Sequence, residues 1–301
     1  MDLTKLATEK RNPDTLTIDE LTTLEVIQKI HEADLGVASC ITPVLKEISS
    51  VVEKVVTAFE NEGRLIYIGA GTSGRLGVLD ASECPPTYGT DPSLVVGVIA
   101  GGDYALQHAI EGAEDDAELG ESDLKALKIT ERDVVVAIAA SGRTPYCLGA
   151  MKYAKTKGAL TAALVCSLDS PMEKLADISI PVVTGPEVVT GSTRMKAGTA
   201  QKLVLNMIST ASMVRWGKVY SNLMVDVQPT NEKLVQRAKN IIIEASGATE
   251  EEAEMALQEQ GGNTKAAIFQ LVTGVAPNEA KLQLDQHNGK LKEAIRNFTQ
   301  K

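Results

Sequence analysis

The same local pattern occurs twice in this chain, and it restricts the possible fold more than any other feature. The apolar segment 64–68 runs into the loop Gly69–Arg75, and a second apolar segment, 134–138, runs into Ala139–Thr144. Each loop contains the triplet Ser-Gly-Arg and is followed by apolar sequence typical of a helix. In α/β proteins a strand, a glycine-rich turn and a helix N-terminus together hold phosphate, because free backbone N–H groups point at the ligand. Two such loops predict one phosphorylated small molecule held from two sides.

Residues 64 to about 217 alternate between short apolar segments and helical patterns. Most of the apolar segments are continuous rather than alternating, which is typical of a parallel sheet covered on both faces. The spacing of about 20 to 40 residues leaves room for right-handed crossover helices. The five predicted strands are 64–68, 94–99, 134–138, 160–166 and 178–183.

Helical sequence precedes and follows this region. Thr17–Glu20 has the pattern of a capping box that opens a first helix, and a broad apolar stripe over 41–59 predicts a second. A long helix is expected from Arg194 to about Trp216, after the hydroxyl-rich segment Gly191–Thr193. The segment 227–231 is predicted to be a linker, and a helical tail with a second capping box at Thr249–Glu252 follows it. This tail resembles the ubiquitin-associated type of bundle, and a small bundle that only packs or assembles is the alternative. We therefore expect N-terminal helices over 1–60, an α/β domain over 61–226 and a small helical bundle over 232–301.

Composition excludes some classes of function. The formal net charge of −10 argues against nucleic acid as a partner, since nucleic-acid binding needs a basic face. The four cysteines form no CxxC pair, and the N-terminus has no signal-peptide core. No run of about 18 apolar residues occurs, so we expect no membrane span. We expect a cytoplasmic protein with reduced thiols, and the three scattered histidines predict no metal site.

The first loop also satisfies the dinucleotide-binding pattern G-x-G-x-x-G over Gly69–Gly74. A dinucleotide site needs an acidic residue at the end of the second strand, about 20 residues further on. Here the second predicted strand ends in Ala100–Gly102, Asp91 precedes that strand, and Asp103 comes too late. The sequence therefore favours a sugar phosphate over a nicotinamide or flavin cofactor.

Hydroxyl groups distinguish both loops. Ser141 and Thr144 flank Gly142, and both could reach one phosphate at a helix start, although a simple N-cap without ligand is the alternative. Arg75 and Arg143 either add positive charge to the site or form structural contacts, and the sequence leaves this open. The predicted phosphate-binding residues are Gly71, Thr72, Ser73, Ser141, Gly142, Arg143 and Thr144.

Two acidic segments are candidates for acid–base chemistry. Glu83 is followed by Pro85 and Pro86, which we expect to end the helix at about Glu83 or Cys84. The negative end of the helix dipole disfavours a carboxylate at that place, which suits a proton donor. The second segment is Glu111–Asp116, and its spacing does not select one of its four acids.

Several long segments resemble the N-acetylmuramic acid 6-phosphate etherases, and the resemblance covers nearly the whole chain. These segments are Leu65–Pro86, Glu111–Asp115, Ala139–Tyr146, Thr190–Lys202 and Asn222–Val227. The resemblance implies a sugar isomerase (SIS) domain of three αβα layers around a five-stranded parallel sheet, in a protein that is usually dimeric. It also implies cleavage of the D-lactyl ether of N-acetylmuramate 6-phosphate, with Glu83 as the acid and Glu114 as a second catalytic group.

The implied chemistry needs two carboxylates and no metal or redox cofactor. Two alternatives remain: an aldose–ketose isomerase for phosphosugars on the same fold, and a non-catalytic sugar-phosphate sensor similar to the glucokinase regulatory protein. The presence of both Glu83 and Glu114 favours the enzyme. We further expect the N-terminal helices to form a homodimer interface near the active site, where His31, Glu32 or Asp34 of one chain could reach the pocket of the other. The sequence does not say whether Lys196 or Lys202 contacts the substrate.

Overall fold

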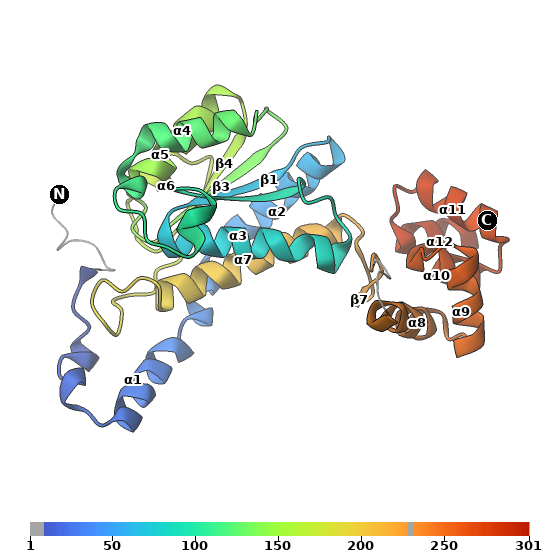
Figure 1. Ribbon diagram of the computed structural model, residues 1–301, viewed down its shortest axis with the longest axis horizontal. Helices are drawn as coiled ribbons and strands as arrows, with labels where there is room; N and C mark the ends of the chain where they lie inside the picture. The colour runs from blue at the N-terminus through green and yellow to red at the C-terminus, as the bar shows by residue number, and fades with distance from the viewer. Residues whose placement is uncertain (1–8, 228–231, 301) are drawn as a thin grey trace. The chain divides into compact units, whose positions relative to one another are not determined.

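The structure is a computed structural model that describes residues 9–227 and 232–300 (Figure 1). Most of the predicted linker, residues 228–231, therefore lies outside the described residues. The chain separates into two compact units. The first runs through Ser82 and resumes over Pro92–Thr210, and the second comprises Glu83–Asp91 and Ala211–Lys301.

A five-stranded parallel sheet forms the centre of the first unit, with strand order β2-β1-β3-β4-β5. All five predicted strands are confirmed, with ends that shift by one or two residues. All residues of β1 and β3 and all but the first of β4 are buried, which explains the continuous apolar runs there, whereas β2 and β5 at the sheet edges are only partly buried. The strands are β1 (Leu65–Gly69), β2 (Val95–Ile99), β3 (Val134–Ala139), β4 (Leu160–Val165) and β5 (Ile178–Pro181).

Helices cover both faces of this sheet, as the prediction of three αβα layers requires (Figure 1). Alternate strand residues such as Ile66 and Val135 pack in one core with α4 (Ala117–Ala126), α5 (Pro145–Thr156) and α6 (Pro171–Leu175). Tyr67 points to the opposite face. That face is covered by α2 (Leu45–Glu60), α3 (Gly71–Tyr88) and α7 (Lys196–Arg215).

The end of α3 corrects one prediction. The helix continues through Pro85 and Pro86 to Tyr88 instead of ending at Glu83 or Cys84. Each proline removes one N–H donor and crowds the preceding turn, but the ladder resumes where the N–H of Gly89 donates to the carbonyl of Pro85 at 2.9 Å. Glu83 therefore lies within the helix and not at its end.

The N-terminal region also begins differently from the prediction. The capping box is formed by Thr22 and Glu25 at the start of α1 (Thr23–Leu35), whereas Ile18–Glu20 forms a 3₁₀ turn. None of the residues of α1 is buried, and Leu24, Ile27 and Leu35 are more than half exposed. Two further 3₁₀ segments, Pro13–Thr15 and Ala38–Val44, flank this helix in the chain.

By length and apolar composition alone, the helical stretch Thr23–Glu60 could cross a membrane, which the sequence reading did not anticipate. Core helices of globular domains meet the same criterion. In the second half of this stretch, Val51 and Val55 of α2 are completely buried, and α2 contacts β1, β3 and β5. The packing of α2 against the sheet accounts for the apolar character of that half.

The second unit contains the predicted helical tail. Its helices share a core that includes Ile242, Leu257 and Phe269, and the capping box Thr249–Glu252 is confirmed. Five helices follow residue 231, so a three-helix bundle would account for only part of the tail. They are α8 (Glu232–Ser246), α9 (Glu250–Glu259), α10 (Thr264–Thr273), α11 (Pro277–Gln286) and α12 (Leu291–Thr299), preceded by the short strands β6 (Val219–Tyr220) and β7 (Leu223–Met224).

Candidate functional site

The two Ser-Gly-Arg loops lie at the carboxyl ends of neighbouring strands. β1 and β3 pair in parallel, with Gly69 opposite Ile138. The second strand, β2, lies on one side of β1, and the third strand, β3, lies on the other side. The direction in which strands are added therefore reverses between β1 and β3. In open α/β sheets, ligands bind outside the carboxyl ends of the strands at such a switch point. The sheet topology thus places both predicted phosphate loops at the position where this fold binds ligands.

The first loop is closely packed around Gly69 and Gly74. Gly71 has a φ of +53° and begins α3, so Thr72 and Ser73 lie in the first turn, where a helix leaves N–H groups without an internal acceptor. A Cβ at Gly74 would lie 2.5 Å from the carbonyl oxygen of Gly69, so no larger residue fits there. The loop therefore offers backbone donors near the end of β1.

The second loop leaves a hydroxyl available at the start of α5. Gly142 has a φ of +65°, and the hydroxyl of Ser141 accepts a hydrogen bond from the backbone N–H of Arg143 at 3.3 Å. Thr144 occupies the N-cap position, yet its side chain makes no capping hydrogen bond. The alternative of a simple Thr144 N-cap is therefore not what the structure contains, and the hydroxyl can serve a ligand.

The two arginines of these loops have different surroundings. Arg75 donates from Nε to the carbonyl of Leu106 at 2.9 Å and from its terminal nitrogen to the carbonyl of Ala105 at 2.7 Å. Arg143 has a buried Nε with no hydrogen-bond partner among the residues that the structure describes. A buried donor without an acceptor is costly, so Arg143 is the arginine that is ready for an anion.

The start of α7 is held by Glu187, a residue that the sequence did not single out, and it includes Lys196. Glu187 is completely buried, and its carboxylate accepts hydrogen bonds from the backbone N–H groups of Lys196 and Ala197, both at 2.9 Å. Lys196 is also buried and donates from Nζ to the carbonyl of Thr184 at 2.8 Å, whereas Lys202 is exposed. Burial and partners of this kind are not visible in a single sequence.

Gln201, one turn further along α7, reaches the first loop. Its Oε1 accepts a hydrogen bond from the hydroxyl of Ser73 at 2.9 Å, and both side chains are buried. In the sequence, the one signal for Gln201 was that it lies in Thr190–Lys202, a segment that resembles the etherase family.

The structure places Glu114 beside the second loop. Arg75 holds the 3₁₀ turn Asp103–Leu106, and the chain then continues to a second 3₁₀ turn, Ala113–Asp115, which packs against α5. The pKa of the Cys147 thiol in α5 is raised to about 12, chiefly by burial and in part by the negative charge of Glu114. The exposed carboxylate of Glu114 is therefore close to the first turn of the helix that follows Ser141–Thr144.

Glu83 is separated from its own first loop by most of α3. It lies twelve residues after Gly71 in the same helix, which corresponds to about 18 Å along the axis at 1.5 Å per residue. Its side chain is exposed.

The three residues proposed to reach a second chain lie on α1. His31 and Glu32 are exposed, and Glu32 forms an ion pair with Lys29 at 3.1 Å. Asp34 is half-buried, and its Oδ1 is buried without a hydrogen-bond partner among the described residues. Glu32 and Lys196 both line a cavity of about 410 Å³ within the first unit, so α1 approaches the start of α7.

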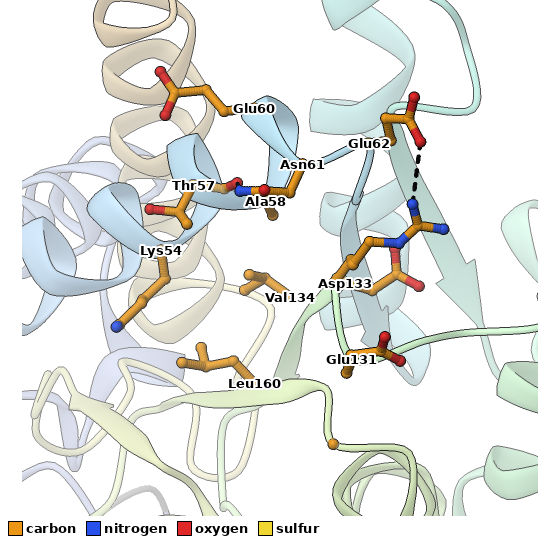
Figure 2. A pocket seen from close by; sticks show the side chains of 12 residues that line it. Lys54, Thr57, Ala58, Glu60, Asn61, Glu62, Glu131, Asp133, Val134 and Leu160 are labelled. Atoms are coloured by element: carbon orange, nitrogen blue, oxygen red, sulfur yellow. Dashed lines mark hydrogen bonds and ion pairs between the residues drawn. The ribbon is translucent and has the colours of Figure 1, made fainter.

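A larger cavity of about 700 Å³ lies at the other edge of the sheet (Figure 2). It is lined by the end of α2 and by residues just before β3 and β4, with an ion pair between Glu62 and Arg132 at 3.1 Å on its rim. This edge carries the amino ends of the strands, away from both hydroxyl-rich loops. We therefore place the candidate site at the loops and not in the larger cavity. Within the described ranges, no group of three or more His, Cys, Asp or Glu side chains could hold a metal ion.

The parallel sheet and its two loops define the class of protein, and family models agree. Residues 116–211 match the SIS domain, and residues 47–155 match the N-terminal SIS domain of the glucokinase regulatory protein. A putative phosphosugar isomerase involved in capsule formation from Bacteroides fragilis NCTC 9343 shares the fold, with a TM-score of 0.51 and 19% identity over 67% of this chain and 95% of that one. The chain is thus a SIS-domain protein.

Curated relatives narrow this class to one family. The chain is 57% identical over 295 residues to the N-acetylmuramic acid 6-phosphate etherase of Aliivibrio fischeri (strain MJ11), covering 98% of both chains. It is 55% identical over 297 residues to N-acetylmuramic acid 6-phosphate etherase 2 of Vibrio parahaemolyticus, covering 99% of both. This protein belongs to the N-acetylmuramic acid 6-phosphate etherase family.

Proposed function

We propose that this protein cleaves the D-lactyl ether of N-acetylmuramic acid 6-phosphate and releases N-acetylglucosamine 6-phosphate and D-lactate. The single observation that carries the proposal is the pair of hydroxyl-rich loops at the switch point between β1 and β3. The identity of 55–57% to full-length proteins named for this activity supports it. The reaction belongs to amino sugar catabolism and cell-wall recycling. The enzyme is a carbon–oxygen lyase, and we expect it in the cytoplasm.

The two loops hold the phosphate in this proposal. The backbone N–H groups of Thr72 and Ser73, the hydroxyl of Thr144 and the guanidinium of Arg143 supply donors and positive charge for a dianion. Binding at a phosphate remote from the reacting carbons positions the sugar, so the binding energy lowers the barrier at C2 and C3.

The chemistry requires the open-chain sugar, whose C1 aldehyde acidifies the proton on C2. A base removes that proton, and the electron pair forms the C2–C3 double bond as the C3–oxygen bond breaks. An acid protonates the departing lactyl oxygen. Water then adds to C3 of the unsaturated aldehyde and a proton returns to C2. Two carboxylic groups supply every proton transfer.

Glu83 and Glu114 are the proposed catalytic residues. Glu114 acts as the base at C2, since it lies beside the helix that follows Ser141–Thr144. Glu83 protonates the lactyl oxygen and then activates water. We propose that it serves the site of a second copy of the chain, and its separation of about 18 Å from the first loop along α3 supports this. The exposed apolar residues of α1 support a homodimer in which each site takes residues from both copies.

A test of the reaction is D-lactate release from N-acetylmuramic acid 6-phosphate in oxygen-18 water. We expect release by the wild type with label at C3 of the sugar, and loss of release in Glu83→Ala and Glu114→Ala. Glu111→Ala is the matched control, because Glu111 is an exposed acid of the same segment as Glu114. A wild type that binds the sugar phosphate without releasing lactate would support the sensor or the isomerase instead.

A test of the shared site mixes two defective variants, Glu83→Ala and Arg143→Ala, at substrate concentrations far below KM. If Glu83 serves the partner's site, each mixed dimer has one intact site, and activity recovers to about a quarter of wild type. If Glu83 serves its own chain, every site keeps one defect and no activity returns. Sedimentation that shows a fully active monomer would also contradict the shared site.

A further inference from the structure

Gln201 is among the most buried polar side chains of the first unit. It is 1% exposed, and its Oε1 accepts the hydrogen bond from the Ser73 hydroxyl at 2.9 Å. The adjacent turn of α7 also lies next to the first loop, since a Cβ at Gly198 would be in ordinary contact with Cγ2 of Thr72 at 3.4 Å. The start of α7 therefore supports the first loop from behind.

The amide of Gln201 has an unmet requirement. Its Nε2 is buried and has no hydrogen-bond partner within the described part of the chain. The oxygen and nitrogen of a glutamine amide have nearly the same shape, so a half-turn of the amide places Nε2 where Oε1 stands. In that orientation Nε2 donates to the Ser73 hydroxyl, and the hydrogen bond between the two side chains is kept with its direction reversed.

The direction of this hydrogen bond decides what Ser73 can do. A serine hydroxyl has a single proton, and a phosphate dianion only accepts hydrogen bonds. While Ser73 donates to Oε1, it has no proton for a phosphate. When Nε2 donates to Ser73 instead, the hydroxyl proton is free to point at the ligand.

We propose that Gln201 is a positioning residue that presents Nε2 to Ser73 and thereby directs the Ser73 hydroxyl at the phosphoryl group of the substrate. Gln201 does not touch the reacting carbons, so it controls phosphate affinity and not the chemical step. The inference rests on the proposed function in taking a phosphorylated amino sugar as the ligand.

The test measures the affinity for N-acetylglucosamine 6-phosphate by calorimetry in two variants. A carboxylate at this position can only accept a hydrogen bond, so in Gln201→Glu the Ser73 hydroxyl donates its proton to the carboxylate and not to the phosphate. We expect the affinity to fall by roughly tenfold to a hundredfold. Gln201→Met removes the Nε2 donor but provides no acceptor for the Ser73 hydroxyl proton. We therefore expect the affinity to fall by only about three- to tenfold. The KM for N-acetylmuramic acid 6-phosphate should rise in parallel, with kcat within about twofold of wild type.

Charge repulsion by the new carboxylate is separated from loss of the proton by repeating both variants in a Ser73→Ala background. We expect the losses caused by Gln201→Glu and Gln201→Met to shrink severalfold there, because the hydroxyl on which they act is gone. Equal losses in both backgrounds would overturn the proposal. Because Gln201→Glu is a buried charge, thermal unfolding is measured in parallel, and the Gln201→Met cycle decides the matter if that variant does not fold.

Measurements on the wild type distinguish a failure of the proposed reaction from a failure of the proposed role of Gln201. Binding of N-acetylglucosamine 6-phosphate without lactate release from the muramic acid substrate overturns the proposed reaction and leaves the Gln201 cycle valid. A wild type that binds no phosphorylated sugar overturns both proposals.

Discussion

The two Ser-Gly-Arg loops have the same sequence core but use their side chains differently. In the first loop the serine is buried against Gln201, and Arg75 donates to two backbone carbonyls. In the second loop the serine accepts only a local backbone hydrogen bond, and Arg143 has a buried Nε without a partner in the described structure. The shared triplet determines the backbone turn, whereas the neighbours of each loop determine what its side chains are free to bind.

The difference divides the work of the site between the loops. The first loop supplies backbone N–H groups and a supported hydroxyl, and its arginine fixes the turn that leads toward Glu114. The second loop supplies the positive charge and the uncommitted Thr144 hydroxyl. Substitutions of matched residues in the two loops should therefore have opposite balances between binding and stability.

Arg143→Ala has the largest expected effect on binding. We expect the affinity for N-acetylglucosamine 6-phosphate to fall by about a hundredfold, because a charge-assisted contact with the phosphate is lost. The thermal midpoint should not fall, since Nε has no partner to lose and the substitution removes an unpaired buried donor. Calorimetry and thermal unfolding measure both. Arg132→Ala is the matched control, because that arginine lies at the amino edge of the sheet.

Arg75→Ala should show the reverse balance. Two carbonyls lose their donor, so we expect the free energy of unfolding to fall by about 1–3 kcal/mol. The turn Asp103–Leu106 loosens and Glu114 loses its position, which lowers kcat by about tenfold or more while product affinity changes little. A hundredfold loss of affinity with unchanged stability would show that both arginines bind phosphate, and the comparison would fail.

Thr144→Val tests the free hydroxyl of the second loop with a side chain of the same shape. We expect about a tenfold loss of affinity for the sugar phosphate and no loss of stability. If the Thr144 hydroxyl instead accepted a capping hydrogen bond from α5 in solution, the variant would lose about 1 kcal/mol of stability. Urea denaturation and calorimetry on one preparation distinguish these results.

The smallest effect on either loop is expected from the amino edge of the sheet. Burial raises the pKa of the Asp133 carboxyl, but hydrogen bonds from Arg64 and from the N–H of Thr130 lower it more, so the pKa lies below its ordinary value. Stability from this group is present above the ordinary pKa near 4 and is lost as pH falls through the folded value. Asp133→Asn should weaken this acid dependence of unfolding and leave sugar phosphate affinity at pH 7 unchanged. A shift in affinity would mean that the two edges are coupled.

Much of the first unit follows from local sequence. Continuous apolar runs between glycine-rich turns specify buried parallel strands, and the five predicted strands are confirmed with small shifts at their ends. The position of the loops at one edge follows from the same parallel arrangement. The capping box of α1 was misplaced by five residues, because Thr17 and Thr22 are both followed three residues later by Glu and only packing selects between them.

The remaining site features depend on contacts between distant segments. The bond between Ser73 and Gln201 joins residues 128 positions apart, and no single-sequence pattern encodes it. The end of α3 was predicted wrongly, because the helix tolerates Pro85 and Pro86 once its other residues are packed. That error matters, since the expectation that the helix dipole makes Glu83 a proton donor rested on a helix end at that residue.

The most direct test of the central claim is a crystal structure with N-acetylglucosamine 6-phosphate bound. We predict a phosphate within hydrogen-bond distance of the Ser73 hydroxyl, the Thr144 hydroxyl and the Arg143 guanidinium, with Glu114 of the same chain and Glu83 of a second copy near C2 and C3. A phosphate bound elsewhere, for example in the cavity at the amino ends of β3 and β4, would contradict the account.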